Sequence, residues 1–341
     1  MTNDKKIYVA LGVLAVLGGT LFALSKSARE DAAKHTPAGA QLPEIKVADA
    51  DVEKIVKIQI DAPGKGKVTL EKQGDAWRLT APIAYAASQA NVKSLLDNLK
   101  QLKVKESIDK TAAAYAQHEL DDVKATHVVA WAGADKKVDL YFGKSGSRGQ
   151  MTRIGGQDGV WVSGGYSAWV YGRELKDWRD KEIAKFEDAN AVSVAITNVN
   201  GSFAFAKNDD KWSGTFGGKP IAGFDPEKVK EMLRAYKTLA AEDFADEKTD
   251  ADTGLDKPAA TVAITLNGDG GTVKLAVGKT TGATGTSRFA RREGAPSAFV
   301  IGSWSADWAT AAEAKFAKAD PAKPAAAPAA SGDAPKPKKK K

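Results

Sequence analysis

The chain has 341 residues, of which 43% are hydrophobic and 27% charged, the balance of a folded protein long enough for two ordinary domains. Its net charge of +7 is carried by the two ends, since residues 318–341 contribute +5, residues 1–34 contribute +2 and the body between them is neutral. A neutral body argues against nucleic acid as a partner. The absence of cysteine excludes disulfides, thiolate metal sites and cysteine nucleophiles. Residues 318–341, rich in Ala, Pro and Lys, predict a disordered tail.

An uncharged stretch of 18 residues, from Ile7 to Leu24, stands near the start of the chain. As a helix it spans about 27 Å, close to the thickness of the hydrocarbon core of a bilayer. One interpretation is a cleaved signal peptide, with Ala23 and Ser25 at the cleavage site, and the other is an uncleaved anchor. The length favours the anchor. We predict a single transmembrane helix within residues 1–27, a linker at 28–44 and a soluble part on the periplasmic side of the inner membrane.

The body repeats itself at an offset of 135 to 138 residues, which predicts two copies of one unit, at 45–184 and 185–317. Each copy begins with three segments of alternating apolar residues, typical of half-buried strands, and continues with a helix that has one apolar stripe. The stripe residues are Val92, Leu95, Leu96, Leu99 and Leu102 in the first copy and Val229, Met232, Leu233, Tyr236 and Leu239 in the second. The segment order predicts β-β-β-α-β-β-β-β with a short closing helix, an α+β fold whose antiparallel sheet carries the helix on one face.

Short motifs recur at matching places in the two copies, and we interpret them as structural. A tryptophan begins the third strand and a proline follows it in the first copy; a Gly-Leu-Asp-x-Pro turn, complete in the second copy and degraded in the first, precedes the later strands. A Val-x-Leu-x-x-Gly-Lys segment ends one of those strands, where we expect a turn. The residues that carry these motifs are Trp77, Pro82, Asp121 and Gly143 in the first copy and Trp212, Gly254, Leu255, Asp256, Pro258 and Gly278 in the second.

The sequence contains no recognisable catalytic or metal-binding set. The Gly143-Lys144-Ser145 segment resembles the end of a phosphate-binding loop, but that motif needs a further glycine where Val138 stands, and the second copy fails in the same way. The histidines at positions 35, 118 and 127 lack the spacing of metal ligands. We therefore expect no enzymatic activity, no cofactor and no metal. An active site built between the two copies is left open.

Five aromatic residues gather near the end of the first copy, and they are the candidate binding surface: Trp161, Tyr166, Trp169, Tyr171 and Trp178. Aromatic side chains at this density can stack on sugars or anchor a protein partner. They can equally close the hydrophobic core of the first copy. The core interpretation is favoured, because aromatic side chains are usually buried.

The chain resembles the domain-of-unknown-function 4340 family of bacterial envelope proteins. The resemblance rests on the apolar N-terminal stretch, on Trp77-Arg78-Leu79 followed by Pro82, on the amphipathic helices, on the turn at Gly254 and on the Leu-x-x-Gly strand ends, and it covers nearly all of 45–317. It implies a non-enzymatic protein with an extracytoplasmic accessory role, because members of the family are non-enzymatic and are often encoded beside components of gliding-type ABC transporters.

Two functions from different classes remain. In the first, the chain is a membrane-anchored periplasmic accessory protein of an ABC-type transport or envelope complex and acts by protein–protein binding. In the second, it is a module that binds an envelope polysaccharide or peptidoglycan, with a glycan stacked on the aromatic cluster.

Overall fold

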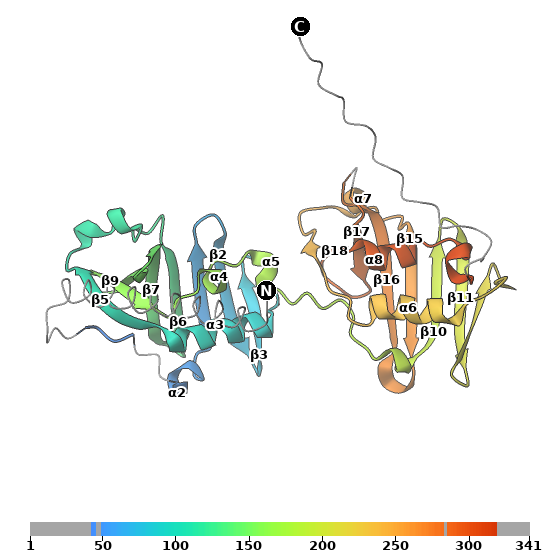
Figure 1. Ribbon diagram of the computed structural model, residues 1–341, viewed down its shortest axis with the longest axis horizontal. Coiled ribbons are helices and arrows are strands. Elements are labelled where there is room, and N and C mark those ends of the chain that lie inside the picture. Colours follow the sequence, from blue (N-terminus) through green and yellow to red (C-terminus); the bar gives the residue numbers. More distant parts are fainter. Residues whose placement is uncertain (1–41, 46–48, 283–284, 319–341) are drawn as a thin grey trace, which may run out of the picture. The chain divides into compact units, whose positions relative to one another are not determined.

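The computed structural model describes residues 42–45, 49–282 and 285–318 and divides the chain into two compact units, with the boundary between Lys181 and Glu182 (Figure 1). The predicted anchor, the linker up to residue 41 and the tail from residue 319 onward lie outside the described residues. Within the described ranges, no helix has the length and apolar character needed to cross a bilayer.

The first unit is built on a nine-stranded antiparallel sheet with the strand order β4-β3-β2-β1-β6-β7-β8-β9-β5. Its strands are β1 (Lys57–Ala62), β2 (Gly66–Gln73), β3 (Ala76–Ala81), β4 (Tyr85–Ala86), β5 (Lys103–Asp109), β6 (Thr126–Ala132), β7 (Asp135–Gly146), β8 (Gly149–Ile154) and β9 (Val160–Gly164). Its helices are α2 (Asp49–Val52), α3 (Gln89–Gln101), the 3-10 turns η1 (Ala112–Ala114) and η2 (Ala116–His118), α4 (Ala168–Tyr171) and α5 (Leu175–Trp178).

The second unit repeats this plan, with the strand order β13-β12-β11-β10-β15-β16-β17-β18-β14. Its strands are β10 (Ala191–Asn198), β11 (Gly201–Asn208), β12 (Lys211–Phe216), β13 (Lys219–Pro220), β14 (Asp243–Phe244), β15 (Ala260–Leu266), β16 (Thr272–Thr280), β17 (Arg288–Arg292) and β18 (Phe299–Ile301). Its helices are η3 (Asp188–Asn190), α6 (Pro226–Tyr236), α7 (Asp250–Thr253), η4 (Gly268–Gly270), α8 (Ser303–Ala309) and η5 (Glu313–Phe316).

The α+β class and the tandem repeat are confirmed, but each sheet has two more strands than expected. One is a two-residue strand, β4 or β13, that pairs antiparallel with the third strand at the near edge of the sheet. The other, β5 or β14, follows the long helix and pairs with the last strand of its unit, at the far edge of the sheet. Sequence periodicity misses β5 because its residues do not alternate cleanly, and it misses β14 because that strand has only two residues.

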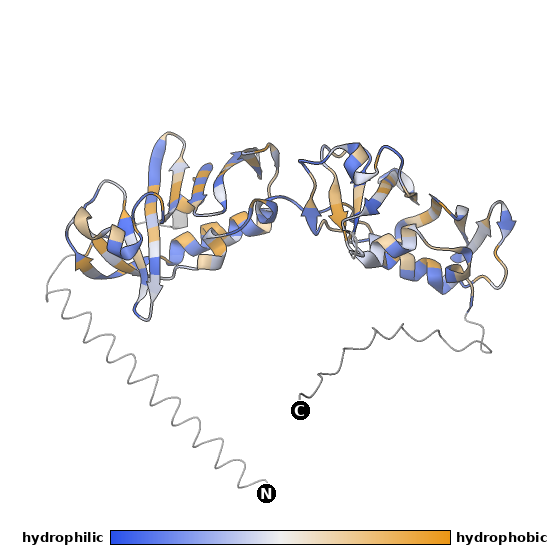
Figure 2. Ribbon diagram, turned by 90° about the horizontal axis from the view of Figure 1, so that it is seen from above, coloured by the Kyte–Doolittle hydropathy of each residue, from blue (hydrophilic) through white to orange (hydrophobic). Residues whose placement is uncertain are grey.

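Each unit has its own hydrophobic core between the long helix and one face of the sheet. In the first unit Val92, Leu95 and Leu99 of α3 are buried against the inward residues of the central strands, and α6 does the same in the second unit. Hydrophobic and hydrophilic positions alternate along these helices and strands (Figure 2). Asp225 caps the start of α6, since its side chain accepts a hydrogen bond from the Glu227 N–H at 3.0 Å.

A buried tryptophan stands at the same inward position of the third strand in both sheets. Trp77 and Trp212 are each 7% exposed at the start of the third strand. The backbone N–H and C=O of Trp77 are both bonded by the Gln89 side chain at the start of α3, at 2.9 Å each, which fixes the helix over this strand. Pro82 follows the strand after a cis peptide bond. The outward side chains of the strands lie on the opposite face of each sheet.

Candidate functional site

The Gly-Lys pair of the first unit lies inside β7, where the preceding turn packs onto the sheet. A Cβ on Gly143 would come well within 3.0 Å of the carbonyl oxygen of His118, so only glycine allows this approach. Lys144 donates from Nζ to the carbonyl oxygen of Gln117 at 2.9 Å. The turn expected after this pair is not there: β7 continues to Gly146, and a bulge in its pairing with β8 accommodates the contact.

The Gly-Lys pair of the second unit makes the same contacts inside β16. Gly278 lies against the carbonyl oxygen of Thr253, and Lys279 Nζ donates to the carbonyl oxygen of Ala251 at 2.8 Å. Both lysines therefore bond backbone carbonyls at the end of a short helical turn, where orphan carbonyls need donors. The motif that resembles a phosphate loop holds a turn on the sheet.

The turn held in this way has one conformation in both units. Gly254 ends α7 in the left-handed region with φ of 72°, and Glu119 ends η2 there with φ of 57°, although it carries a side chain. Leu120, which follows Glu119, is fully buried. The next residue, Asp121, accepts hydrogen bonds from the N–H groups of residues 123 and 124 at 3.2 and 3.1 Å. The second unit has Leu255, Asp256 and Pro258 in these places.

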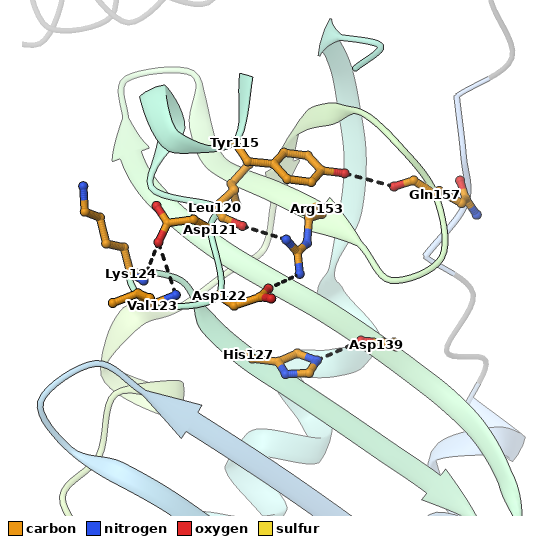
Figure 3. A network of polar contacts seen from close by, with 10 residues as sticks. All are labelled: Tyr115, Leu120, Asp121, Asp122, Val123, Lys124, His127, Asp139, Arg153 and Gln157. Carbon is orange, nitrogen blue, oxygen red and sulfur yellow. Dashed lines mark hydrogen bonds and ion pairs between the residues drawn. The ribbon is translucent and has the colours of Figure 1, made fainter. Parts of the chain in front are cut away.

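A row of outward side chains crosses the first sheet beside this turn (Figure 3). Arg153 of β8 donates to the carbonyl oxygen of Leu120 at 3.1 Å and to a carboxylate oxygen of Asp122 at 2.5 Å. Its guanidinium lies 3.4 Å from the ring centroid of Tyr141 and 4.9 Å from that of Tyr115. The arginine thus links the turn to β7 and β8 by hydrogen bonds and by stacking.

The row continues with a histidine–aspartate pair between β6 and β7 (Figure 3). The ring of His127 stacks on Tyr141 with centroids 3.8 Å apart, and its Nε2 lies 2.8 Å from Asp139 Oδ1. Asp139 also accepts a hydrogen bond from Lys136 at 2.6 Å. Burial alone would raise the pKa of the Asp139 carboxyl, but the hydrogen bonds from Lys136 and His127 outweigh it and lower that pKa.

These contacts tie neighbouring strands together. A histidine–aspartate pair can serve a general base, but here one imidazole face is covered by a tyrosine and one nitrogen is engaged by the carboxylate. Across the described ranges, no three histidine, aspartate or glutamate side chains lie together in a way that could hold a metal ion. The arrangement supports a structural role for the row.

The five candidate aromatic residues do not form one surface. Tyr171 is fully buried, Trp178 is 1% exposed and Trp161 is 7% exposed. Tyr166 is half-buried and stacks on Tyr171 with ring centroids 5.1 Å apart, and burial raises the pKa of its hydroxyl to about 12. Tyr171 and Trp178 belong to the core of the first unit, Tyr166 packs against that core and Trp161 is buried in β9, so these four do not form an exposed stacking surface. Trp169 is the one of the five that faces solvent, with 71% of its surface exposed.

A second exposed tryptophan occupies the matching place in the other unit. Trp169 is the second residue of α4, which follows β9, the last strand of the first unit in chain order. Trp304 is the second residue of α8, which follows β18, the last strand of the second unit. Trp304 is 59% exposed. Arg173 lies over the Trp169 ring, with its guanidinium 3.7 Å from the ring centroid. Trp304 was not among the sequence candidates, although its alignment with Trp169 in the repeat was a usable signal.

Fold and site together define a tandem duplication of one α+β unit whose sequence motifs are architectural. Residues 77–258 and 224–330 match the protein family described as Domain of unknown function (DUF4340), and the chain belongs to this family. No curated protein and no solved structure matches the chain.

Proposed function

We propose that this chain is a non-enzymatic, membrane-anchored accessory protein of an ABC-type transport or envelope complex, with both units on the periplasmic side, and that it acts by protein–protein binding. The observation that carries the proposal is the exposed tryptophan at the same place in each unit, Trp169 and Trp304. Tryptophan is highly buried on average, and it is among the residues that contribute most to binding at protein interfaces.

Two further features support the proposal. The motif residues that would suggest chemistry, above all Lys144 and Lys279, bond backbone carbonyls of their own unit. The apolar stretch from Ile7 to Leu24 has the length of a membrane span and would tether both units beside a membrane partner.

The surface is tested by replacing both exposed tryptophans with alanine in the full-length chain and measuring the partner protein recovered after cross-linking in cells. Loss of two interface anchors is expected to reduce recovery by about tenfold or more. The matched control replaces Val123 and Val199, which are 83% and 84% exposed apolar residues, with alanine. Unchanged recovery with the tryptophan double variant would exclude this surface.

The glycan alternative gives a different result in the same variants. If Trp169 stacks on a sugar, the wild-type chain binds purified cell-wall glycan, the Trp169→Ala variant does not, and no protein partner is recovered. That outcome would replace the protein-binding proposal, because the same exposed ring would then serve carbohydrate.

The location is testable because the chain has no cysteine of its own. The Val123→Cys variant has one exposed thiol in the first unit, and the Val199→Cys variant has one exposed thiol in the second. A membrane-impermeant maleimide is expected to label both variants in intact spheroplasts. Labelling that requires lysis would place the units on the cytoplasmic side and contradict the proposal.

A further inference from the structure

The outward row of the first sheet has a counterpart of identical register in the second. In the first unit neighbouring strands place Asp61, His127, Tyr141 and Arg153 opposite one another in turn. In the second unit the same pairing aligns Thr197, Thr261, Ala276 and Arg291. Each position in one row therefore has a defined equivalent in the other.

In both units the arginine at the end of the row is held by a carboxylate of the adjacent turn, although the two carboxylates stand at different positions of the repeat. Arg153 is bonded to Asp122, and Arg291 is bonded to both carboxylate oxygens of Asp250, at 2.9 and 2.6 Å. Each arginine is thus fixed by a carboxylate from the turn that packs beside the sheet. A planar guanidinium fixed at its edge leaves its faces available for stacking.

The two rows differ in what packs against the face of the guanidinium. Tyr141 stacks under Arg153 in the first unit, and His127 stacks on Tyr141. The second unit has Ala276 and Thr261 in their places, and no aromatic ring of the described residues lies over Arg291. Two positions that carry rings in the first unit thus carry small side chains in the second, while both units have an arginine bonded to a carboxylate.

The space left by the small residues is a hollow of about 400 Å³ on the face of the sheet opposite α6. Small side chains form its floor, and charged ones stand at its rim; the lining includes Ala195, Thr197, Thr261, Ala263, Ala276 and Arg291. All three lining cations already have partners, because Lys274 pairs with Glu293 at 3.1 Å, Arg291 pairs with Asp250, and Arg292 donates to the carbonyl oxygen of Ile183 at 2.9 Å. The hollow therefore calls for an uncharged, flat, apolar group rather than for an anion.

We propose that this hollow binds an aromatic side chain presented by a partner protein, which stacks on Arg291 as Tyr141 stacks on Arg153. The first unit supplies the template for the bound state within the same chain. The inference rests on the proposed function only in that the ring belongs to a partner protein. It uses residues other than Trp169 and Trp304, so that the two proposals fail in different experiments.

The chemistry is tested with N-acetyl-tyrosinamide as the probe and the purified full-length chain, by saturation-transfer NMR. Ala276→Tyr supplies the ring found in the first unit and is expected to weaken probe binding by about tenfold or more. Ala195→Tyr fills the hollow from another of its strands and is expected to act likewise, which keeps the test valid if one variant misfolds. The matched control is Ala206→Tyr, an exposed alanine of the adjacent strand β11 that does not line the hollow.

Binding of the probe to the wild-type chain and to the control, but to neither filled variant, is the expected result. Equal binding to all four chains would overturn the site. Equal binding of the cyclohexylalanine analogue would overturn the stacking on Arg291, because an aliphatic ring has no π face.

The source of the ring is tested in cells, by cross-linking and recovery of the partner. Ala276→Tyr is expected to lower recovery and Ala206→Tyr to leave it unchanged. If Ala276→Tyr abolishes binding of N-acetyl-tyrosinamide but leaves recovery of the partner unchanged, the hollow accepts a free aromatic compound and the assignment to a partner protein is wrong. Loss of recovery only in the tryptophan double variant would likewise keep the proposed function and overturn this inference.

Discussion

The Cα of Gly143 packs against the carbonyl oxygen of His118 so closely that no side chain fits between them, and Gly278 packs against Thr253 in the same way. The contact joins a turn to the middle of a strand, and a lysine next to each glycine completes it. The motif shared by the two units is thus explained by steric fit and by the capping of a helical turn.

Gly143→Ala is expected to lower the free energy of unfolding by about 1–3 kcal/mol, because a Cβ forces the turn away from β7. The matched control is Gly146→Ala in the same strand, where a Cβ would meet nothing within 4 Å. Urea denaturation followed by circular dichroism measures both. Equal losses in the two variants would mean that strand propensity, rather than the close contact, sets the need for glycine.

Glu119→Gly is expected to stabilise the first unit by about 1 kcal/mol, because Glu119 holds a left-handed conformation that a side chain disfavours. The second unit has Gly254 at this place. Glu119→Ala removes the same carboxylate but keeps the unfavourable Cβ, and it should bring no such gain. A rise in melting temperature with alanine as large as that with glycine would contradict the conformational explanation.

Trp178→Ala is expected to destabilise the first unit by about 3–5 kcal/mol, since it removes a large, almost fully buried side chain. Trp169→Ala should change stability by no more than about 0.5 kcal/mol, because that ring is exposed. Thermal melts of the two variants make the comparison directly. A large loss of stability in the Trp169→Ala variant would show that Trp169 supports the fold and would argue against its role in a binding surface.

Acid should remove the stabilisation provided by Asp139. Because the folded state lowers the pKa of this carboxyl below its ordinary 3.8, the contribution is fully present above that value and is lost as pH falls through the folded-state pKa. The melting temperature of wild type should therefore exceed that of Asp139→Asn near neutral pH, and the difference should shrink below about pH 4. A difference that does not change with pH would show that the carboxylate charge is not what stabilises this site.

The parts of the fold that follow from local pattern were predictable. The five-residue apolar stripe places α3 and α6, and the shared tryptophans mark the third strand, because periodicity reports which side chains face the core. Strand β5 was not predictable, since it pairs with β9 across the intervening residues 110–159 and its own pattern is irregular. Pairing partners at such separation are set by the packed sheet.

The candidate site was predictable only in part. Aromatic density pointed to residues 161–178, but it does not separate buried Trp178 from exposed Trp169, which lie in adjacent short helices. The hollow beside Arg291 depends on the alignment of four neighbouring strands. The Val-x-Leu-x-x-Gly-Lys segments already align Ala276 with Tyr141 in the sequence, but the residues that lie beside them on the neighbouring strands are known only from the register of both sheets.

The most direct measurement for the central claim is recovery of the tagged full-length chain from its native membranes in mild detergent, after cross-linking in cells, with mass spectrometry of the accompanying proteins. If the chain is a membrane-anchored accessory protein, a permease and its ATPase should be recovered in amounts near-equal to that of the chain. Less of both should be recovered when Trp169 and Trp304 are replaced. Recovery of the chain alone, or with glycan fragments, would contradict the claim.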